Sequence, residues 1–280
     1  MTLLQWNMGV FEEGTSAAAE LRRAELLGDL VEDRRPDVIA VQEAPRTRVA
    51  RLLRDRGYEI DAPRHRLLTA WHARKWAATV QQPFAYERVS ALVLRRLDDD
   101  GGGPLVLVCN VHAPSRLRKS PEQIEEKLGD LVREIQSYRS NPDTGSFAEV
   151  IVGDFNLDPH RSILQSKSGL GGCRSHRHVA GQERARRRDG LVNERTRALY
   201  NPSWQLSGGI EEPLGTYYYT GDIGSPWFVY DQALFSTDLV AGPVTAEVVA
   251  RVGGRDLLTS RVRKPNPDVG SDHLPVVWRF

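Results

Sequence analysis

Residues 149–156, Glu-Val-Ile-Val-Gly-Asp-Phe-Asn, join a short apolar run to a polar end. The apolar run Val150–Val152 is β-branched throughout, which favours a strand, and its unbroken apolar character is typical of a strand buried on both faces. Packing alone gives no reason to place Asp154 and Asn156 directly after such a strand. Because ligand sites of α/β proteins commonly lie just beyond strand ends, both residues are candidate functional residues.

The same pattern, a predicted strand with a polar residue at its end, recurs along the whole chain. Five further positions, on five predicted strands, carry Asn, Glu, Asp or His in this way. They are Asn7 after Leu3–Trp6, Glu43 after Asp37–Val41, His112 in Leu105–His112, Asp231 in Val229–Ser236, and Asp272-His273 before Leu274–Phe280. Together these positions form a constellation rather than one motif.

Helical patterns lie between the strands and indicate the fold class. The predicted helices are Ala17–Arg35, Thr47–Arg56 with Thr47 as its cap, and one from Ser120 to about Arg139 that has Pro121 in its first turn. Residues 98–103, Asp-Asp-Asp-Gly-Gly-Gly, predict a hairpin. No repeat or clear linker divides the chain. We therefore expect a single α/β domain over residues 1–280, with packed sheets and helices on the outer faces.

Composition excludes several classes of protein. The chain has 280 residues, a formal net charge of +1, 40% hydrophobic and 27% charged residues, which argues against a disordered chain, a fibre or a coiled coil. No apolar run reaches the roughly 18–20 residues that a membrane span needs. The two cysteines, Cys109 and Cys173, are too few for a disulfide framework, so we expect a reduced, cytoplasmic setting.

The strand-end residues occur in short motifs that resemble the endonuclease/exonuclease/phosphatase superfamily, in that family's order. The motifs are Trp6-Asn7, Gln42-Glu43, Asn110-Val111-His112, Gly153-Asp154-Phe155-Asn156, Tyr230-Asp231 and Ser271-Asp272-His273-Leu274-Pro275. The resemblance implies a two-sheet α/β sandwich of the DNase I-like type with one divalent-metal site. It also implies hydrolysis of phosphate esters with Mg²⁺, for which Mn²⁺ can substitute.

The resemblance also implies a metal-ligand set. Glu43 is expected as the main ligand, helped by Asn7 and Asp272. A hard cation with oxygen ligands neutralises the negative charge of a phosphodiester and polarises its phosphoryl oxygen, which explains why carboxylate and amide oxygens are needed.

The implied catalytic residues are Asp154, Asn156, His273, Asp231 and His112. Asp154 would orient or deprotonate the attacking water, and Asn156 would position that water or donate to the transition-state oxygens. His273, held by Asp231, would donate to the developing oxyanion. His112 matches a second histidine of the secreted-DNase-like branch, and Glu87 is its expected carboxylate partner from position alone.

The substrate is less well determined than the chemistry. An Arg-rich insertion or loop is expected at about residues 168–197, and eight arginines against three acids give Arg174–Arg197 a net charge of +5. If this segment borders the active-site mouth, Arg186, Arg187 and Arg188 would contact successive phosphates of a polynucleotide. The alternative is a solvated loop. Trp227 is expected at the rim of the site as a substrate contact.

Three functions remain open from the sequence. The first is a Mg²⁺-dependent nuclease that cleaves DNA, with RNA as a second substrate. The second is a phosphatase or phosphodiesterase for a small molecule or lipid head group, since a fold does not fix a substrate. The third is a module that binds nucleic acid without cleaving it.

Overall fold

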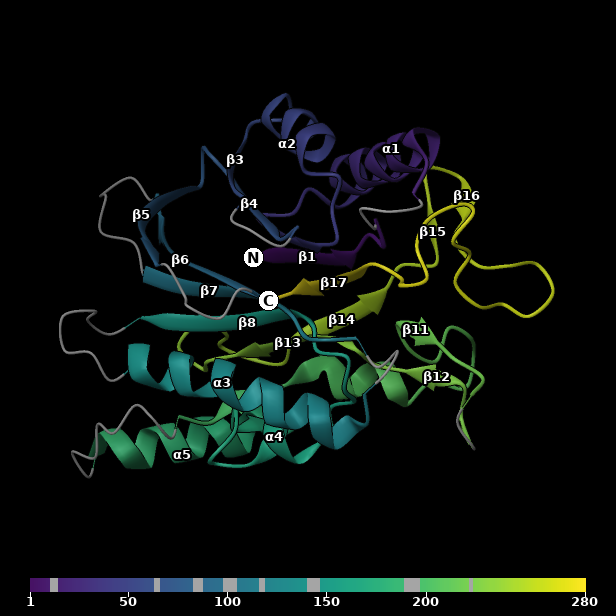
Figure 1. The fold of residues 1–280 in the computed structure, drawn as a ribbon. Coiled ribbons are helices and arrows are strands. Elements are labelled where there is room, and N and C mark those ends of the chain that lie inside the picture. Colours follow the sequence, from purple (N-terminus) through teal and green to yellow (C-terminus); the bar gives the residue numbers. More distant parts are fainter. Residues whose placement is uncertain are drawn as a thin grey trace.

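The computed structural model describes residues 1–10, 15–62, 66–82, 88–97, 105–115, 119–139, 147–188, 197–221 and 224–280. Two β-sheets pack face to face, and the larger helices cover their outer sides (Figure 1). The sequence-based prediction of an α/β sandwich is therefore confirmed.

The first sheet has six strands, and helices α1 (Ala17–Arg34) and α2 (Arg46–Arg54) cover its outer face. Its strand order is β14 (Thr245–Val248), β17 (Val276–Arg279), β1 (Thr2–Asn7), β2 (Val38–Gln42), β4 (Leu68–His72) and β3 (Tyr58–Asp61). The first and last strands of the described chain thus pair at the centre of this sheet.

The second sheet has seven strands, and α3 (Pro121–Arg139) and α4 (Ser162–Gln165) pack on its outer face. Its order is β5 (Trp76–Gln82), β6 (Val89–Arg96), β7 (Leu105–His112), β8 (Ala148–Asp154), β13 (Asp231–Phe235), β10 (Leu199–Tyr200) and β9 (Gly172–Cys173). Helix α5 (His176–Arg188) and a 3₁₀-helix (Pro202–Ser207) follow β9 and β10.

Two small hairpins complete the fold, one formed by β11 (Tyr217–Tyr218) and β12 (Trp227–Phe228), the other by β15 (Arg251–Val252) and β16 (Arg255–Asp256). Both lie at the right-hand end of the sandwich in Figure 1, away from the N-terminus where β1 begins.

Alternation of side chains in the central strands builds three hydrophobic layers. In β2, Val38 and Ala40 face the layer between the two sheets, whereas Ile39 and Val41 face α1 and α2. Both faces of the sheet are therefore buried, which explains why these strands read as continuous apolar runs. Among the described residues no helix is long and apolar enough to cross a membrane.

Strand direction brings several strand ends together. β1 runs parallel to β2 and β7 runs parallel to β8, while β13 is antiparallel to β8 and pairs Asp231 with Asp154. The β7–β8 approach is close at Gly153, where φ is +145° and a Cβ would lie 1.9 Å from the carbonyl oxygen of Val111. Only glycine fits this position.

Some elements differ from the sequence-based expectation. Strands β3, β4 and β5 were not predicted, and α5 is a helix where a polar loop was expected. The second helix starts at Arg46 with Pro45 at its N-cap and no side-chain cap, so the prediction of Thr47 as the cap was wrong. The third helix begins as expected, with reciprocal hydrogen bonds between Ser120 and Gln123. Residues 98–103, where a hairpin was expected, lie outside the described residues.

Candidate active site

Four strand ends bring polar side chains to one end of the sandwich. In β1 and β2, Asn7 pairs in register with Gln42, the residue before Glu43. In β7 and β8, His112 pairs with Asp154. The Asn7 Nδ2 atom donates across the two sheets to Asp154 Oδ2 at 2.9 Å. The strand-end positions identified from the sequence therefore meet in space.

Asp154 is the centre of a buried hydrogen-bond cluster and is 1% exposed. Its Oδ1 accepts from the backbone N–H of Asn156 at 2.8 Å, and its Oδ2 also accepts from Asn156 Nδ2 at 3.1 Å. Asn156 has φ of +50°, a left-handed conformation that asparagine adopts more readily than most residues. Its Nδ2 donates to the Ala113 carbonyl as well, at 3.1 Å. Donors thus hold the Asp154 carboxylate in one orientation.

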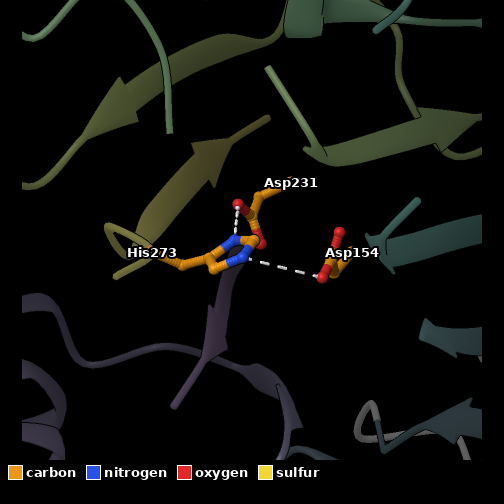
Figure 2. A group of neighbouring side chains, drawn as sticks. All are labelled: Asp154, Asp231 and His273. Carbon is orange, nitrogen blue, oxygen red and sulfur yellow. Dashed lines mark hydrogen bonds and ion pairs between the residues drawn. The ribbon is translucent and has the colours of Figure 1, made fainter. Parts of the chain in front are cut away.

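His273 lies between two carboxylates, as Figure 2 shows. Its Nδ1 is 2.8 Å from Asp231 Oδ2, and its Nε2 is 3.8 Å from Asp154 Oδ2. The other oxygen of Asp231 accepts from Gln5 Nε2 at 2.6 Å. The ring of Tyr217 packs against the imidazole with centroids 4.7 Å apart. These contacts fix the ring and direct Nε2 towards Asp154.

Burial and charge set the ionisation of this pair. Burial raises the pKa of Asp154 to about 6, since a buried carboxylate loses its hydration, and the charge of His273 opposes this rise. Burial would lower the pKa of His273, but the charges of Asp231 and Asp154 and the hydrogen bond to Asp231 outweigh it and raise that pKa to about 10. At neutral pH the cluster therefore holds a carboxylate beside an imidazolium.

Glu43 and His112 form a second pair beside Asp154. Glu43 has φ of +48°, and its Oε1 lies 3.3 Å from His112 Nε2, which is 3.9 Å from Asp154 Oδ2. The hydrogen bond from the Val10 N–H to the Glu43 carbonyl ties the ends of β1 and β2 together. The expected partner of His112, Glu87, lies outside the described residues; Glu43 faces His112 in the structure.

Asp272 lies on the far side of the β1 loop and is held there by α1. Its Oδ1 accepts from the Ser271 hydroxyl at 3.1 Å and would lie 3.1 Å from a Cβ at Gly9. The buried guanidinium of Arg23 donates to the Gly9 carbonyl at 2.5 Å and the Gly270 carbonyl at 2.6 Å. Burial lowers the pKa of Arg23, and the carboxylates of Asp272 and Glu43 oppose this shift. Arg23 thus clamps the loops that carry Asn7 and Asp272.

Two groups of side chains have the composition of a metal site. Asp154, Asp231 and His273 offer ligand atoms within 4.8 Å of one another. Nδ1 of His273 is already bonded to Asp231 at 2.8 Å, however, so only its Nε2, 3.8 Å from Asp154 Oδ2, is left to ligate a cation. Glu43, Asn7 and Asp272 supply only oxygen atoms, which hard divalent cations prefer. This second set therefore has the ligand composition that a hard divalent cation prefers.

The Arg-rich segment does not join these residues. Arg187 pairs with Asp238 at 2.5 Å. Arg197 pairs with the same carboxylate and donates to the carbonyl of Phe147, the residue before β8. Asp154 ends β8, about 20 Å further along at roughly 3.3 Å per residue. α5 ends at Arg188, and for Arg186 the structure describes only the backbone. α5 runs towards the opposite end of the sandwich (Figure 1), so the expectation that the segment borders the site mouth differs from the structure for Arg187, Arg188 and Arg197, whereas residues 189–196 lie outside the described residues.

A pocket of about 830 Å³ adjoins the site on the Asn156 side. Trp227, the expected rim residue, lies in its wall and is only 6% exposed, with its ring edge-on to Tyr218. Aromatic rings continue from this wall to the site, in the order Phe228, Tyr230, Tyr217 and His273, with neighbouring centroids 4.7–5.2 Å apart. Packed aromatic rings therefore link the wall of the pocket to the candidate histidine, which does not itself line the pocket.

Sequence reasoning missed three residues that support the site. Gln5 and Arg23 are buried and hydrogen-bond to the site or its loops, and Tyr217 stacks on His273. Gln5 could have been identified from the sequence, because it is a polar residue within the apolar run Leu3–Trp6, and the structure buries it completely. Arg23 carried no such signal, because an arginine on an amphipathic helix is normally exposed.

The sequence profile of the Endonuclease/Exonuclease/phosphatase family matches residues 4–273. The match covers nearly the whole chain and every residue of the cluster described above. The chain belongs to this family, whose members are phosphoesterases. A search of curated protein sequences gave no match.

Solved structures give the same fold. The human Nocturnin catalytic domain with a bound sulfate anion has a TM-score of 0.60 at 16% identity, covering 99% of this chain and 93% of that chain. A humanized D. rerio TDP2 has a TM-score of 0.57 at 16% identity, covering 100% and 99%. A mannosyl-6-phosphatase from Bacteroides thetaiotaomicron has a TM-score of 0.61 at 13% identity, covering 100% and 98%. At these identities the likeness concerns the fold.

Proposed function

We propose that this chain is a divalent-metal-dependent nuclease that hydrolyses phosphodiester bonds, with DNA as its first substrate and RNA as the second to be tested. The observation that carries the proposal is the buried arrangement in which His273 lies between Asp231 and Asp154, beside the oxygen donors of Glu43 and Asn7. In this arrangement the Asp154 carboxylate can accept a proton, and the charged imidazolium of His273 is held in a fixed position beside it.

His273 suits the stabilisation of a developing negative charge. An imidazolium is the stronger hydrogen-bond donor, and the pKa of about 10 keeps His273 protonated at neutral pH. Asp231 accepts the hydrogen bond from Nδ1–H of His273, so Nε2–H of the same ring is the donor that remains for a phosphoryl oxygen. Gln5 keeps Asp231 in place by donating to its second oxygen.

Asp154 suits the activation of water. As the water oxygen bonds to phosphorus, one water proton passes to Asp154 and the bond between phosphorus and the leaving oxygen breaks. His112 is proposed to supply the proton that the leaving oxygen takes up, and Asn156 to orient the water through its side-chain amide. A pKa of about 6 leaves Asp154 ionised at neutral pH yet basic enough to accept the proton.

Glu43, Asn7 and Asp272 would hold the cation, Mg²⁺ with Mn²⁺ as a substitute. When bound, the cation neutralises charge on the phosphate and polarises a phosphoryl oxygen. Asn7 donates to Asp154 through Nδ2, so its Oδ1 faces the loop and retains a lone pair beyond the bond from the Gly9 N–H.

Support for a nucleic-acid substrate comes from a relative with the same fold. A structure of D. rerio TDP2 in complex with a single-strand DNA product has a TM-score of 0.56 at 15% identity, and covers 100% of this chain and 99% of that chain. The test is incubation of the purified protein with Mg²⁺ and plasmid DNA, a single-stranded oligonucleotide or RNA. We expect cleavage that disappears with chelator and in Asp154→Asn and His273→Gln. Full activity in both variants would overturn the assigned roles.

A phosphatase acting on a small phosphate ester is the second candidate. The mannosyl-6-phosphatase with the same fold and the pocket of about 830 Å³ beside Asn156 favour it, because that volume suits one compact group. Mannose 6-phosphate and a chromogenic diester in the same panel separate the two candidates. Tight oligonucleotide binding with no single-turnover cleavage in Mg²⁺ or Mn²⁺ would instead indicate a binding module.

A further inference from the structure

Residues 251–264, the β15–β16 hairpin and the loop that follows it, form a cationic lobe at the site end of the sandwich. The segment has five basic residues and one acid, Asp256, a net charge of +4 in fourteen positions. We propose that the cationic lobe binds the backbone of a polynucleotide while one of its phosphodiesters occupies the candidate active site. This inference rests on the proposed nuclease function and names the surface that would select a polymer.

The charges of the lobe are exposed and only partly neutralised. Arg263 pairs with Asp256 at 2.7 Å, and Arg251 is 3.9 Å from the same carboxylate. Arg255, Arg261 and Lys264 are exposed and form no ion pair with any residue that the structure describes. Three side chains are therefore available to phosphates, whereas Asp256 stabilises the hairpin from within.

The lobe has a defined shape rather than being a loose loop. The Thr259 N–H donates to the Lys264 carbonyl, and Leu258 pairs with Pro265 as an isolated bridge. The Leu257 N–H donates to the Ala250 carbonyl, and the Asn266 N–H to the Leu257 carbonyl. Figure 1 shows the resulting loop projecting outwards beyond β15 and β16.

The base of the lobe is fixed to the candidate site. Arg22 donates to the Asp268 carbonyl, and Arg23 donates to the Pro267 and Gly270 carbonyls. Asp272 follows Pro265, the residue after the lobe, by seven residue steps, which span at most about 25 Å. Since one strand of a duplex carries a phosphate about every 3.4 Å along the axis, the base of the lobe lies within about seven base steps of Asp272.

An extended polyanion fits this surface better than a small ligand does. The lobe lines neither the pocket beside Asn156 nor the two pockets lined by Arg46–Arg48 and by Trp76 and Phe280. Separate, exposed cations on a projecting loop suit successive phosphates, which bind with little sequence preference. The lobe should therefore act on affinity for the polymer and leave the chemistry of a single diester unchanged.

The test neutralises three charges while it leaves both ion pairs of Asp256 intact. The lobe variant is Arg255→Gln/Arg261→Gln/Lys264→Gln. The matched control, Arg54→Gln/Arg74→Gln/Arg96→Gln, removes three exposed arginines near the other end of the sandwich. Backbone hydrogen bonds define that end: the N–H groups of Leu97, Ala73 and His72 donate to the carbonyls of Lys75, Gly57 and Asp37, respectively. Equal melting temperatures would establish that both variants fold.

We expect kcat/KM of the lobe variant on a 30-nucleotide single strand to fall at least tenfold at 100 mM salt. The slope of log(kcat/KM) against log[salt] should become shallower by about 0.7 for each phosphate that the variant no longer neutralises. Hydrolysis of bis(p-nitrophenyl) phosphate should stay within twofold, and the control variant should match the wild type on both substrates. An unchanged salt slope, or an equal loss in the control variant, would overturn the proposal.

Binding without turnover separates failure of this inference from failure of the nuclease function. With chelator present, fluorescence anisotropy of a labelled oligonucleotide should show at least tenfold weaker binding for the lobe variant, whatever the enzyme cleaves. If the wild type binds the oligonucleotide but never cleaves it, the lobe proposal stands and the nuclease function fails. If the lobe variant loses only binding to phosphatidylserine vesicles, the lobe is a membrane surface and the proposal is wrong.

Discussion

Asp154 illustrates how position changes the chemistry of one side chain. The carboxylate is fully enclosed at the end of β8, between His112, His273 and two asparagine amides. Because burial raises its pKa to about 6, Asp154 becomes protonated as the pH falls below that value and can no longer accept a proton. A bound cation can only lower this pKa.

We therefore predict that kcat/KM decreases as the pH decreases through a midpoint at or below about 6. In Asp154→Asn the rate should be lower by about 10²–10⁴-fold, the usual contribution of a general base, and this acid limb should disappear. A pH–rate profile with Mg²⁺ at saturation measures both effects. A midpoint well above 6 would show that another group controls the limb.

The His273–Asp231 pair makes a separate prediction about stability. The folded protein raises the pKa of His273 from 6.5 to about 10, so between these values the folded state binds more protons than the unfolded state. The stabilisation is complete below pH 6.5 and is lost as the pH rises through 10. Urea unfolding in chelator should show the free energy of unfolding decreasing over this range, and Asp231→Asn should flatten the decrease. A flat wild-type curve would contradict the assignment.

Gly153 allows the cost of close strand approach to be separated from the cost of an unusual backbone. Both Gly153 and Gly57 have positive φ, but a Cβ would meet the Val111 carbonyl at the first and nothing within 4 Å at the second. We predict that Gly153→Ala destabilises the protein by more than about 4 kcal/mol, and Gly57→Ala by only about 1 kcal/mol. Urea unfolding of the two variants gives the comparison, and similar losses would refute the steric argument.

At the scale of elements, sequence patterns predicted the central strands and the capped helix α3 well. Both faces of a central strand carry apolar side chains, so the strand appears in the sequence as a run of consecutive apolar residues and can be predicted without knowing its partners. Strand β5, which begins Trp-Ala-Ala-Thr, lacks that pattern, and its pairing with β6 determines it instead. Helix α5 was expected to be a loop because its sequence is strongly polar and rich in arginine, although its Arg, Gln, Glu and Ala residues favour a helix.

The prediction of the site follows the same division. Residues at the ends of buried strands, such as Asp154 and His112, were identifiable because their polarity conflicts with their surroundings. The clamp formed by Arg23 was not, because its partners are backbone carbonyls of loops distant in sequence. Sequence can indicate a polar residue in an apolar context, but not a partner that only the fold brings near.

The α1 clamp gives a prediction at this scale. Arg23→Met removes the donors to the Gly9 and Gly270 carbonyls and a charge beside Asp272 and Glu43. We predict a loss of about 2–4 kcal/mol in the free energy of unfolding, because buried carbonyls lose their partners. Mn²⁺ affinity, measured by calorimetry, should also fall about tenfold, because Arg23 no longer holds the loops that carry Asn7 and Asp272 in fixed positions relative to each other.

Two further variants test whether this effect is specific. Arg23→Lys should recover part of the Mn²⁺ affinity, since an ammonium group can still donate to one carbonyl. Arg22→Met, on the same helix, should leave Mn²⁺ affinity unchanged because Arg22 contacts only the Asp268 carbonyl among the bonds described. Equal Mn²⁺ affinity in Arg23→Met and the wild type would mean that the clamp serves stability alone.

At the scale of the whole molecule, 38 basic and 37 acidic residues sum to a net charge of +1, and the fold separates these opposite charges in space. α5 carries arginines away from the candidate site, and Asp238 neutralises part of them. The cationic lobe carries others at the end where the carboxylates gather. The composition of a segment does not tell where the fold places it. The Arg-rich segment has the higher net charge in the sequence, but the cationic lobe is the one at the site end of the sandwich.

The order of the strands has a consequence for when the protein can become active. Asn7 ends β1, His273 lies three residues before the first residue of β17, and these first and last described strands pair with each other inside the first sheet. At a synthesis rate of about 5–20 residues per second, these 280 residues take roughly 15–55 s to emerge from the ribosome. Until the last of these residues are made, β1 has β2 beside it but lacks its other neighbour, β17, and the site lacks His273. A hydrolase built in this way cannot act on nearby phosphate esters while its own chain is still being translated.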